Sequence, residues 1–156
     1  MAKQHGVKEI CANRKAFHEY FVLERFEAGI ELAGTEVKSV RGGNVNLKDS
    51  FCTVKNGELF LRGAHISPYE HGNIFNKDPV RPRRLLMHKR EITKLNARVM
   101  QDGVALIPLS LYFRDGRVKV ELGLCKGKKL HDKRDSEADR QAKRDIDRAI
   151  KERSAL

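Results

Sequence analysis

The sequence predicts a mainly β protein, a small antiparallel barrel with about three helices and a basic C-terminal tail. Two hairpin signals and one amphipathic helix lead to this prediction. The first hairpin joins residues 50–55 to 58–64 through Asn56-Gly57, a dipeptide favoured in type I′ turns, whose twist matches that of the strands. The second joins residues 104–114 to 117–124 through Asp115-Gly116. Its last strand alternates apolar with charged residues, so one face is expected to be buried.

Before the first hairpin we expect one strand and one short helix. Residues 17–32 are rich in bulky β-favouring side chains, which predicts a strand with a bend or bulge at Gly29. Residues 34–41 have apolar side chains three apart and a capping hydroxyl at Thr35, and the stop signal Gly42-Gly43 follows. This second pattern predicts a short helix.

A longer amphipathic helix is expected between the two hairpins. Apolar residues recur there at helical spacing, at Leu85, Ile92, Leu95 and Val99, and the pattern ends near Gly103. Four or more antiparallel strands with helices inserted between them suggest a barrel that closes its own edges, of the oligonucleotide-binding (OB) type or close to it. We therefore expect one OB-like barrel domain over residues 1–125.

The composition changes abruptly after residue 125. In residues 126–156, 18 of 31 residues are charged and bulky apolar residues almost vanish. Small and apolar residues nevertheless recur every four positions, at Ala138, Ala142, Ile146 and Ile150. A stripe this thin cannot hold a helix against a core, so this basic tail is expected to be disordered when free and helical once bound.

The charge balance favours a polyanionic partner. The 156 residues include 32 Lys and Arg against 21 Asp and Glu, a formal charge of +11, which attracts a polyanion whatever the fold. No apolar run approaches a membrane span and no export signal is seen in residues 1–10, so a cytoplasmic protein is expected. Nucleic acid is the leading partner, and the low aromatic content of 6% gives weight to phosphate and shape recognition.

A catalytic role has little support in the sequence. The three cysteines are too far apart for a Cys-x-x-Cys metal site and too few for a disulfide framework. His18, His65 or His131 with Glu19 or Asp132 would permit a metal-dependent ribonuclease, but no metal-binding or nucleophile motif accompanies them. We expect no enzyme, no metal and no cofactor.

Two basic clusters are candidate RNA-binding segments. Residues 79–90 contain five Lys and Arg without an acid, and a phosphate backbone would relieve their mutual repulsion by counterion release. Residues 126–134 contain five cations and one acid, and Gly127 lets the backbone follow a row of phosphates. The alternative for each cluster is a solvated helix face or linker. His18, beside Tyr20 at a strand edge, either stacks on an unpaired base or has a structural role.

Five blocks of the sequence, in order, resemble the small protein B family. They are residues 13–21 (Asn-Arg-Lys-Ala-Phe-His-Glu-Tyr-Phe), 34–41, 83–92, 110–112 and 126–134. One block alone would be a weak match, but five blocks spread over nearly the whole chain are specific. Members of this family are the protein partners of tmRNA in bacterial trans-translation.

The resemblance implies an OB-type barrel that cradles the tRNA-like domain of tmRNA and replaces the missing anticodon arm. Family members enter the vacant decoding site of ribosomes stalled on messages without a stop codon. The alanine-charged tmRNA, with the elongation factor that carries aminoacyl-tRNA, then accepts the nascent peptide. The implied partners are therefore tmRNA and the ribosome, at the small-subunit rRNA of the decoding site and at the mRNA channel. The chain would be an adaptor, since the chemistry belongs to the ribosome and the synthetase.

The resemblance and the basic clusters together give two sets of expected contact residues. The tmRNA-binding set is Tyr20, Glu27, Arg41, Arg83, Arg84, Leu86, Lys89 and Arg90. The set for the decoding site and the mRNA channel is His18, Gly127, Lys128, Lys129, Asp132, Lys133 and Arg134. Two alternatives to tmRNA binding remain: a module for other structured RNA, such as a ribosomal or initiation-factor-like barrel, and a charge that serves solubility alone.

Overall fold

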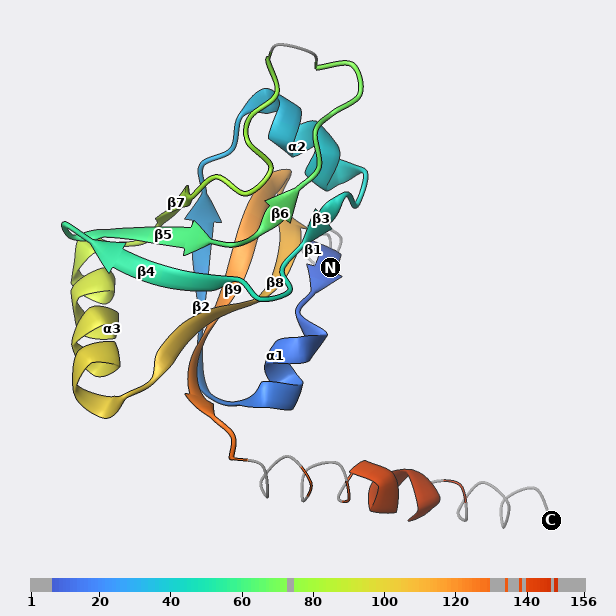
Figure 1. Cartoon of the computed structure of the whole chain (residues 1–156), viewed down its shortest axis with the longest axis vertical. Coiled ribbons are helices and arrows are strands. Elements are labelled where there is room, and N and C mark those ends of the chain that lie inside the picture. Colours follow the sequence, from blue (N-terminus) through green and yellow to red (C-terminus); the bar gives the residue numbers. More distant parts are fainter. Residues whose placement is uncertain are drawn as a thin grey trace. The chain divides into compact units, whose positions relative to one another are not determined.

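The computed structural model describes residues 7–72, 75–129, 134, 138, 140–146 and 148 (Figure 1). The chain divides into two units, Met1–Lys126 and Gly127–Leu156. In the second unit residues 140–146 are helical, and there the Gln141 side chain donates to Asp145 Oδ1 at 3.0 Å. The order of the tail in solution stays a prediction. His131, Asp132 and Lys133 lie outside the described residues.

The first unit is mainly β, with three helices among its described residues. Its strands are β1 (Val7–Ala12), β2 (Tyr20–Ile30), β3 (Val45–Asn46), β4 (Phe51–Lys55), β5 (Glu58–Arg62), β6 (His65–Ile66), β7 (Arg83–Leu86), β8 (Ala105–Arg114) and β9, which runs on to Gly127 (Arg117–Gly127). The helices are α1 (Arg14–Glu19), α2 (Gly34–Arg41) and α3 (Lys89–Asp102). The main sheet has the order β1-β8-β4-β5-β7-β2-β9, β8 also pairs with β9, and β3 and β6 form a separate ribbon.

Both predicted hairpins are confirmed. In the β4–β5 hairpin, Asn56 and Gly57 have φ values of 53° and 77°, as the two central residues of a type I′ turn require. In the β8–β9 hairpin, Asp115 and Gly116 have φ values of 52° and 80°. The second turn fixes the register of the long strands β8 and β9, so that Val120, Leu122 and Leu124 all face the core and are completely buried.

The predicted strand over residues 17–32 is wrong at its start. Helix α1 occupies Arg14–Glu19, and strand β2 begins only at Tyr20. The reason is Asn13, a buried helix cap whose Oδ1 accepts from the Ala16 amide at 3.2 Å while its Nδ2 donates to the Pro108 carbonyl at 2.9 Å. This one side chain therefore begins a helix and attaches it to β8.

The other two predicted helices are confirmed, with corrections at their first turns. Helix α2 covers the expected residues, but its cap is Ala33, whose amide donates to Glu36 Oε1 at 2.9 Å; Thr35 has no capping role. Helix α3 begins at Lys89, because Leu85 belongs to strand β7. The helical spacing of apolar residues in the sequence placed the start of this helix one turn too early, at Leu85.

The apolar core lies between the sheet and α3. Its fully buried members include Leu59, Leu61, Leu85 and Leu106, and each such side chain stabilises the fold by about 1.5–3 kcal/mol. A second, smaller cluster joins Ala16 of α1 to Ile107, Leu109 and Cys125. The helices described in the structure are all too short or too polar to cross a bilayer.

Candidate nucleic-acid interface

Three segments that are distant in sequence meet around the tip of the β8–β9 hairpin. Glu27, Arg41 and Leu86 each line a separate surface hollow there. The hollows adjoin one another, because the first two share Glu9 and the last two share Gly116. We call this region the hairpin-end surface and define it by residues 112–119 with Glu27, Arg41 and Leu86. The structure thus brings together three residues of the expected tmRNA-binding set.

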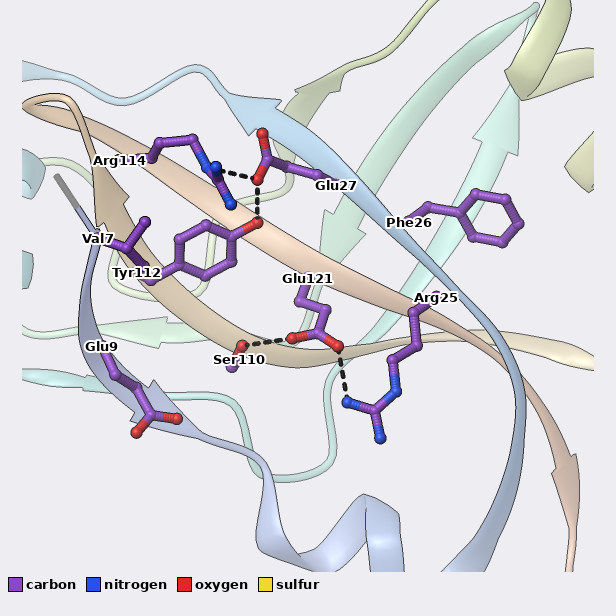
Figure 2. A pocket seen from close by; sticks show the side chains of 9 residues that line it. All are labelled: Val7, Glu9, Arg25, Phe26, Glu27, Ser110, Tyr112, Arg114 and Glu121. Atoms are coloured by element: carbon purple, nitrogen blue, oxygen red, sulfur yellow. Dashed lines mark hydrogen bonds and ion pairs between the residues drawn. The ribbon is translucent and has the colours of Figure 1, made fainter. Parts of the chain in front are cut away.

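Glu27 lies on the exposed side of β2 and is held by two groups of β8 (Figure 2). The Tyr112 hydroxyl donates to Glu27 Oε2 at 2.5 Å, and Arg114 Nε donates to the same oxygen at 2.9 Å. The Arg114 guanidinium also lies 5.7 Å from the centre of the Tyr112 ring. Burial, and then the hydrogen bond to Glu27, raise the pKa of Tyr112 to about 12, so its hydroxyl keeps its proton at neutral pH.

The tip of the hairpin is strongly basic. Arg41, at the end of α2, lies 5.7 Å from the centre of the Phe113 ring, and Arg117 and Lys119 lie on β9. Within the described part of the chain none of these three cations has an ion pair. Cations without an ion pair, gathered at the tip of a hairpin, suit the phosphates of a nucleic acid, which supply most of the electrostatic part of its affinity for proteins.

Leu86 is the apolar member of the hairpin-end surface. Its side chain is 45% exposed although it lies on a paired strand, where it faces Gly29 of β2. A Cβ at Gly29 would lie 3.3 Å from the Cβ of Leu86, so a side chain at that position would crowd it. Gly29 therefore leaves room for Leu86, which stays an exposed apolar side chain near the cations of the hairpin tip.

The basic run over residues 79–90 is only partly a surface feature. Arg83 is completely buried: its Nε donates to Glu36 Oε2 at 2.7 Å, and its Nη groups donate at 2.9 Å to the carbonyls of Ala64 and Pro79. This corrects the expectation that Arg83 contacts RNA. A buried arginine with each guanidinium nitrogen donating to a protein oxygen supports the fold instead.

Glu36 is the centre of this buried network. Besides Arg83 it binds Arg81, whose Nε donates to Oε2 at 3.1 Å and whose Nη2 bonds to Oε1. Burial alone would raise the pKa of Glu36, but the hydrogen bonds from Arg81, the Ala33 amide and Arg83 outweigh it and lower the pKa. The network attaches helix α2, and with it Arg41, to strand β7.

The remaining cations of the run are exposed and differ in their partners. Arg84 forms ion pairs with Glu31 at 3.4 Å and Glu58 at 3.9 Å, so much of its charge is neutralised. Lys89 and Arg90 begin helix α3, and neither has an ion pair with a residue that the structure describes. Of the five cations of this run, these two remain the best suited to phosphate contact.

The opposite end of β2 presents aromatic rings. Phe17, Phe21 and Phe51 are each about 40% exposed, and Tyr20 and Phe51 line one hollow with α1. His18 is half-buried and belongs to helix α1, which differs from the strand edge expected for it. We call the region defined by Phe17, His18, Tyr20, Phe21 and Phe51 the α1-end surface.

Tyr20 therefore does not lie with the other expected tmRNA contacts. It is seven positions from Glu27 along β2, a distance of about 23 Å. Strand β9 ends on the same side as Tyr20. Near that end, Cys125 belongs to the small apolar cluster with Ala16, and Tyr20 packs against the same cluster. From the tail, Gly127, Lys129 and Arg134 are exposed and Lys128 is half-buried.

The sequence analysis did not single out Arg25, Arg114, Arg117 and Lys119, which the structure places in the hollows that Glu27 and Leu86 line. For the last three the signal was the alternation of charged with apolar residues in the β8–β9 hairpin, which was used only to predict the core. Among the described residues no group of three or more His, Cys, Asp and Glu is placed to hold a metal ion. Burial raises the pKa values of Cys11, Cys52 and Cys125.

Comparison with known proteins gives one consistent family. The family described as SmpB protein matches residues 10–152. An SsrA-binding protein of Clostridium botulinum is 59% identical over 154 residues, which cover 99% of each chain. An SsrA-binding protein of Clostridium beijerinckii is 58% identical over the same length.

A solved structure agrees with these relatives. It is described as "tmRNA-SmpB: a journey to the center of the bacterial ribosome" and has 47% sequence identity to this chain. The match has a TM-score of 0.66 and covers 83% of this chain and 92% of the other. Family, sequence and fold thus agree over nearly the full length, and the chain belongs to the SmpB protein family.

Proposed function

We propose that the chain is an RNA-binding adaptor of trans-translation, which binds the tRNA-like domain of tmRNA and delivers it to the decoding site of stalled ribosomes. Its membership of the SmpB family, its identity to SsrA-binding proteins and its likeness to a tmRNA–SmpB structure support this function. Its cellular location follows from the function, because ribosomes work in the cytoplasm.

The observation that carries the proposal is the convergence of Glu27, Arg41 and Leu86 at the tip of the β8–β9 hairpin. These residues come from three separate elements, and unpaired cations surround them. Such a surface offers phosphate contacts for affinity and one apolar contact for an unstacked base or a ribose. Lys89 and Arg90 extend it as further cations.

The α1-end surface has a different task in this proposal. His18 and the neighbouring aromatic rings suit unpaired bases, such as those of small-subunit rRNA at a vacant decoding site. Gly127, Lys128, Lys129, Asp132, Lys133 and Arg134 would follow the empty mRNA channel, with the tail helical once seated. Tyr20 supports α1 and orients this end. The elongation factor that carries aminoacyl-tRNA would bring the charged tmRNA with the adaptor.

The sheet is proposed to close as an OB-like barrel. The pairing order returns to β8 through β9, since β9 neighbours β2 on one side and β8 on the other, and this supports closure. A closed barrel leaves few free edges and holds the hairpin rigidly. Its role is that of a scaffold: no reaction is assigned to the chain, and peptide transfer belongs to the ribosome.

The test is binding of the purified chain to three RNAs of equal length at physiological salt: the tRNA-like domain of tmRNA, an elongator tRNA and a random sequence. The proposal predicts binding to the tRNA-like domain at least 10³-fold tighter than nonspecific binding, which is the lower end for specific nucleic-acid complexes. Equal affinity for all three RNAs would leave only a basic RNA-binding barrel.

A further inference from the structure

The connection between β6 and β7 lies beside helix α2 (Figure 1). Two contacts attach it to the helix. The Thr35 hydroxyl donates to the Phe75 carbonyl at 3.2 Å, and the Lys38 ammonium lies 5.3 Å from the centre of the Tyr69 ring. We call this connection the α2 loop and define it by the part that the structure describes, residues 67–72 and 75–82.

Hydrogen bonds within the α2 loop fix its shape. The Asn76 side chain bonds twice to the Tyr69 backbone, since it accepts from the amide and donates to the carbonyl, each at 2.9 Å. The Gly72 amide donates to the same carbonyl, and the Phe75 amide donates to the Gly72 carbonyl, again at 2.9 Å. A Cβ at Gly72 would lie 2.7 Å from Asn76 Oδ1 and 2.9 Å from Thr35 Cγ2, so a side chain there would displace one of them.

The buried Glu36 network holds the C-terminal end of the loop. Arg83 donates to the Pro79 carbonyl at 2.9 Å, and the same carbonyl accepts from the Ile66 amide at 2.9 Å. Arg81, within the loop, is paired with Glu36 of α2. The loop is thus attached to α2 at its middle and to the buried network at its end, and it presents its side chains from a fixed backbone.

This backbone holds a large apolar ring in solvent. Phe75 is 72% exposed, more than any other phenylalanine that the structure describes. Its amide and its carbonyl are both hydrogen-bonded, so its backbone is fixed although its ring is not covered. A single exposed apolar side chain is common and indicates nothing by itself. A ring on a fixed backbone, however, loses little further freedom when it binds, and its neighbours show which ligand it suits.

The ridge of α2 that carries the loop is basic. Thr35, Lys38 and Arg41 follow one another at intervals of three residues, so they lie on one ridge of the helix surface that is about 9 Å long. Lys38 lies over the Tyr69 ring, and Arg41 lies over the Phe113 ring at 5.7 Å. Neither cation has an ion pair with a described residue. The ridge therefore connects the α2 loop to the hairpin-end surface, of which Arg41 is a member.

Acids do not outnumber the cations of this region. Residues 34–41 and 67–82 contain four Lys and Arg against three Asp and Glu. Of the three acids, Glu36 is buried in its pairs with arginines, and the Asp78 carboxylate accepts from a backbone amide at 3.0 Å. Glu70 remains, against three cations that have no ion pair with a described residue, Lys38, Arg41 and Lys77. This balance favours a polyanion over a neutral protein surface as the ligand.

We propose that Phe75 stacks on an unpaired base of the tRNA-like domain, and that Lys38 and Arg41 bind adjoining phosphates of the same strand. Asn76 is the positioning residue, since it fixes the loop that presents the ring. An aromatic ring beside cations is a common means of holding unpaired RNA. This inference rests on the proposed function and extends the hairpin-end surface along α2 by a contact to a base.

A tryptophan reporter tests the stacking directly, because the chain contains no Trp. F75W keeps an aromatic face and places the sole indole at the proposed contact. Its fluorescence is expected to be quenched when the full chain is saturated with the tRNA-like domain, and to change little with a fully paired RNA duplex, which offers no unpaired base. M100W is the matched control, because Met100 on α3 is also strongly exposed, at 79%, and no RNA contact is assigned to it.

Affinities measured over a range of salt concentrations separate the ring from the cations. F75A is expected to weaken binding to the tRNA-like domain roughly 5- to 150-fold, the range for one lost stacked base, with an unchanged slope of log K against log[salt]. K38Q should instead lower that slope by about 0.7–0.9. F75L keeps apolar bulk without a ring and should lose nearly as much as F75A. N76A should lose less, with no further loss when it is combined with F75A.

Three outcomes overturn the stacking contact. The first is F75W fluorescence that stays unchanged at saturation with the tRNA-like domain, and the second is an unaltered affinity for F75A. The third is quenching that requires the ribosome or the elongation factor, because the ring then binds another partner. Urea unfolding of F75A should match that of the unaltered chain, since the ring is exposed. Failure of the function itself looks different, because the unaltered chain then shows no preference for the tRNA-like domain over random RNA.

Discussion

Strand β2 runs from α1 toward α2 (Figure 1), and its two ends expose different side chains. At the end near α2, the hairpin-end surface presents Arg41, Arg114, Arg117 and Lys119, while its aromatic rings at Tyr112 and Phe113 lie against arginines. At the end near α1, three phenylalanines are about 40% exposed, and the Arg25 guanidinium lies 5.6 Å from the ring centre of one of them, Phe17. The first surface is suited to phosphates and the second to unpaired bases.

This difference shows how a small chain can bind two RNAs at once. A backbone-binding surface recognises a folded RNA by its shape, whereas a stacking surface needs bases that are already unpaired. The two ends are about 23 Å apart along β2, so one ligand need not displace the other. We infer that tmRNA occupies the hairpin end and that ribosomal RNA meets the α1 end.

The largest effect is expected from a variant that disrupts the buried Glu36–Arg83 ion pair, which helps to attach α2 to β7. R83M removes the completely buried arginine of the Glu36 network and leaves the Ala64 and Pro79 carbonyls without their donor, and removal of one member of a buried ion pair destabilises a protein by about 3–5 kcal/mol. Urea unfolding measures this loss. R84M, which removes an exposed arginine from the next position, is expected to lower the unfolding free energy by less than about 1 kcal/mol. Equal losses in the two variants would contradict a structural role for Arg83.

The next effect removes the unpaired charges of the hairpin end. A triple variant with Arg41, Arg117 and Lys119 each changed to Gln is expected to lower the salt slope of binding to the tRNA-like domain by about 2–3, since each phosphate contact contributes about 0.7–0.9. Thermal unfolding should be nearly unchanged, because none of the three cations is ion-paired with a described residue. An unchanged slope would place the RNA elsewhere.

A smaller effect tests the α1 end. Replacement of His18 and Phe51 by Ala is expected to weaken binding to stalled ribosomes by about 1–3 kcal/mol for each base that loses its stacking partner. Binding to the isolated tRNA-like domain should stay within about twofold of the unaltered chain. If instead both affinities fall together, the two ends do not have separate ligands.

The smallest expected effect is on how the free energy of unfolding depends on pH in the acidic range. The pKa of Glu36 is lower in the folded chain than its ordinary value of 4.5, so its stabilising contribution is complete above pH 4.5 and is lost as the pH falls through the folded-state pKa. Unfolding free energies measured between pH 2.5 and 6 should fall less steeply for E36Q than for the unaltered chain. Identical slopes would show that the Glu36 network does not stabilise the fold.

Much of the fold was predictable because turn chemistry is local. The dipeptides Asn56-Gly57 and Asp115-Gly116 determine two hairpins without reference to the rest of the chain. Helix α1 was missed because its cap depends on a tertiary contact, the bond from Asn13 to the Pro108 carbonyl 95 residues away. A window of sequence rich in β-favouring residues does not contain that information.

The candidate site was predictable in kind but not in detail. The net charge of +11 indicates a nucleic-acid partner, yet it does not distinguish Arg83, which is completely buried, from Arg84, whose side chain is 45% exposed. Burial depends on where Glu36 lies in three dimensions, 47 residues earlier in the chain. The pairing of Glu27 with Arg114 likewise appears only once β2 and β8 are placed together.

The most direct test of separate ends is an NMR titration of the ¹⁵N-labelled full chain with the tRNA-like domain of tmRNA. The account predicts that the largest amide shifts fall in residues 112–119, at Arg41 and at Leu86, while residues 17–21 and Phe51 change little. Shifts centred on residues 17–21, with the hairpin tip unchanged, would contradict it.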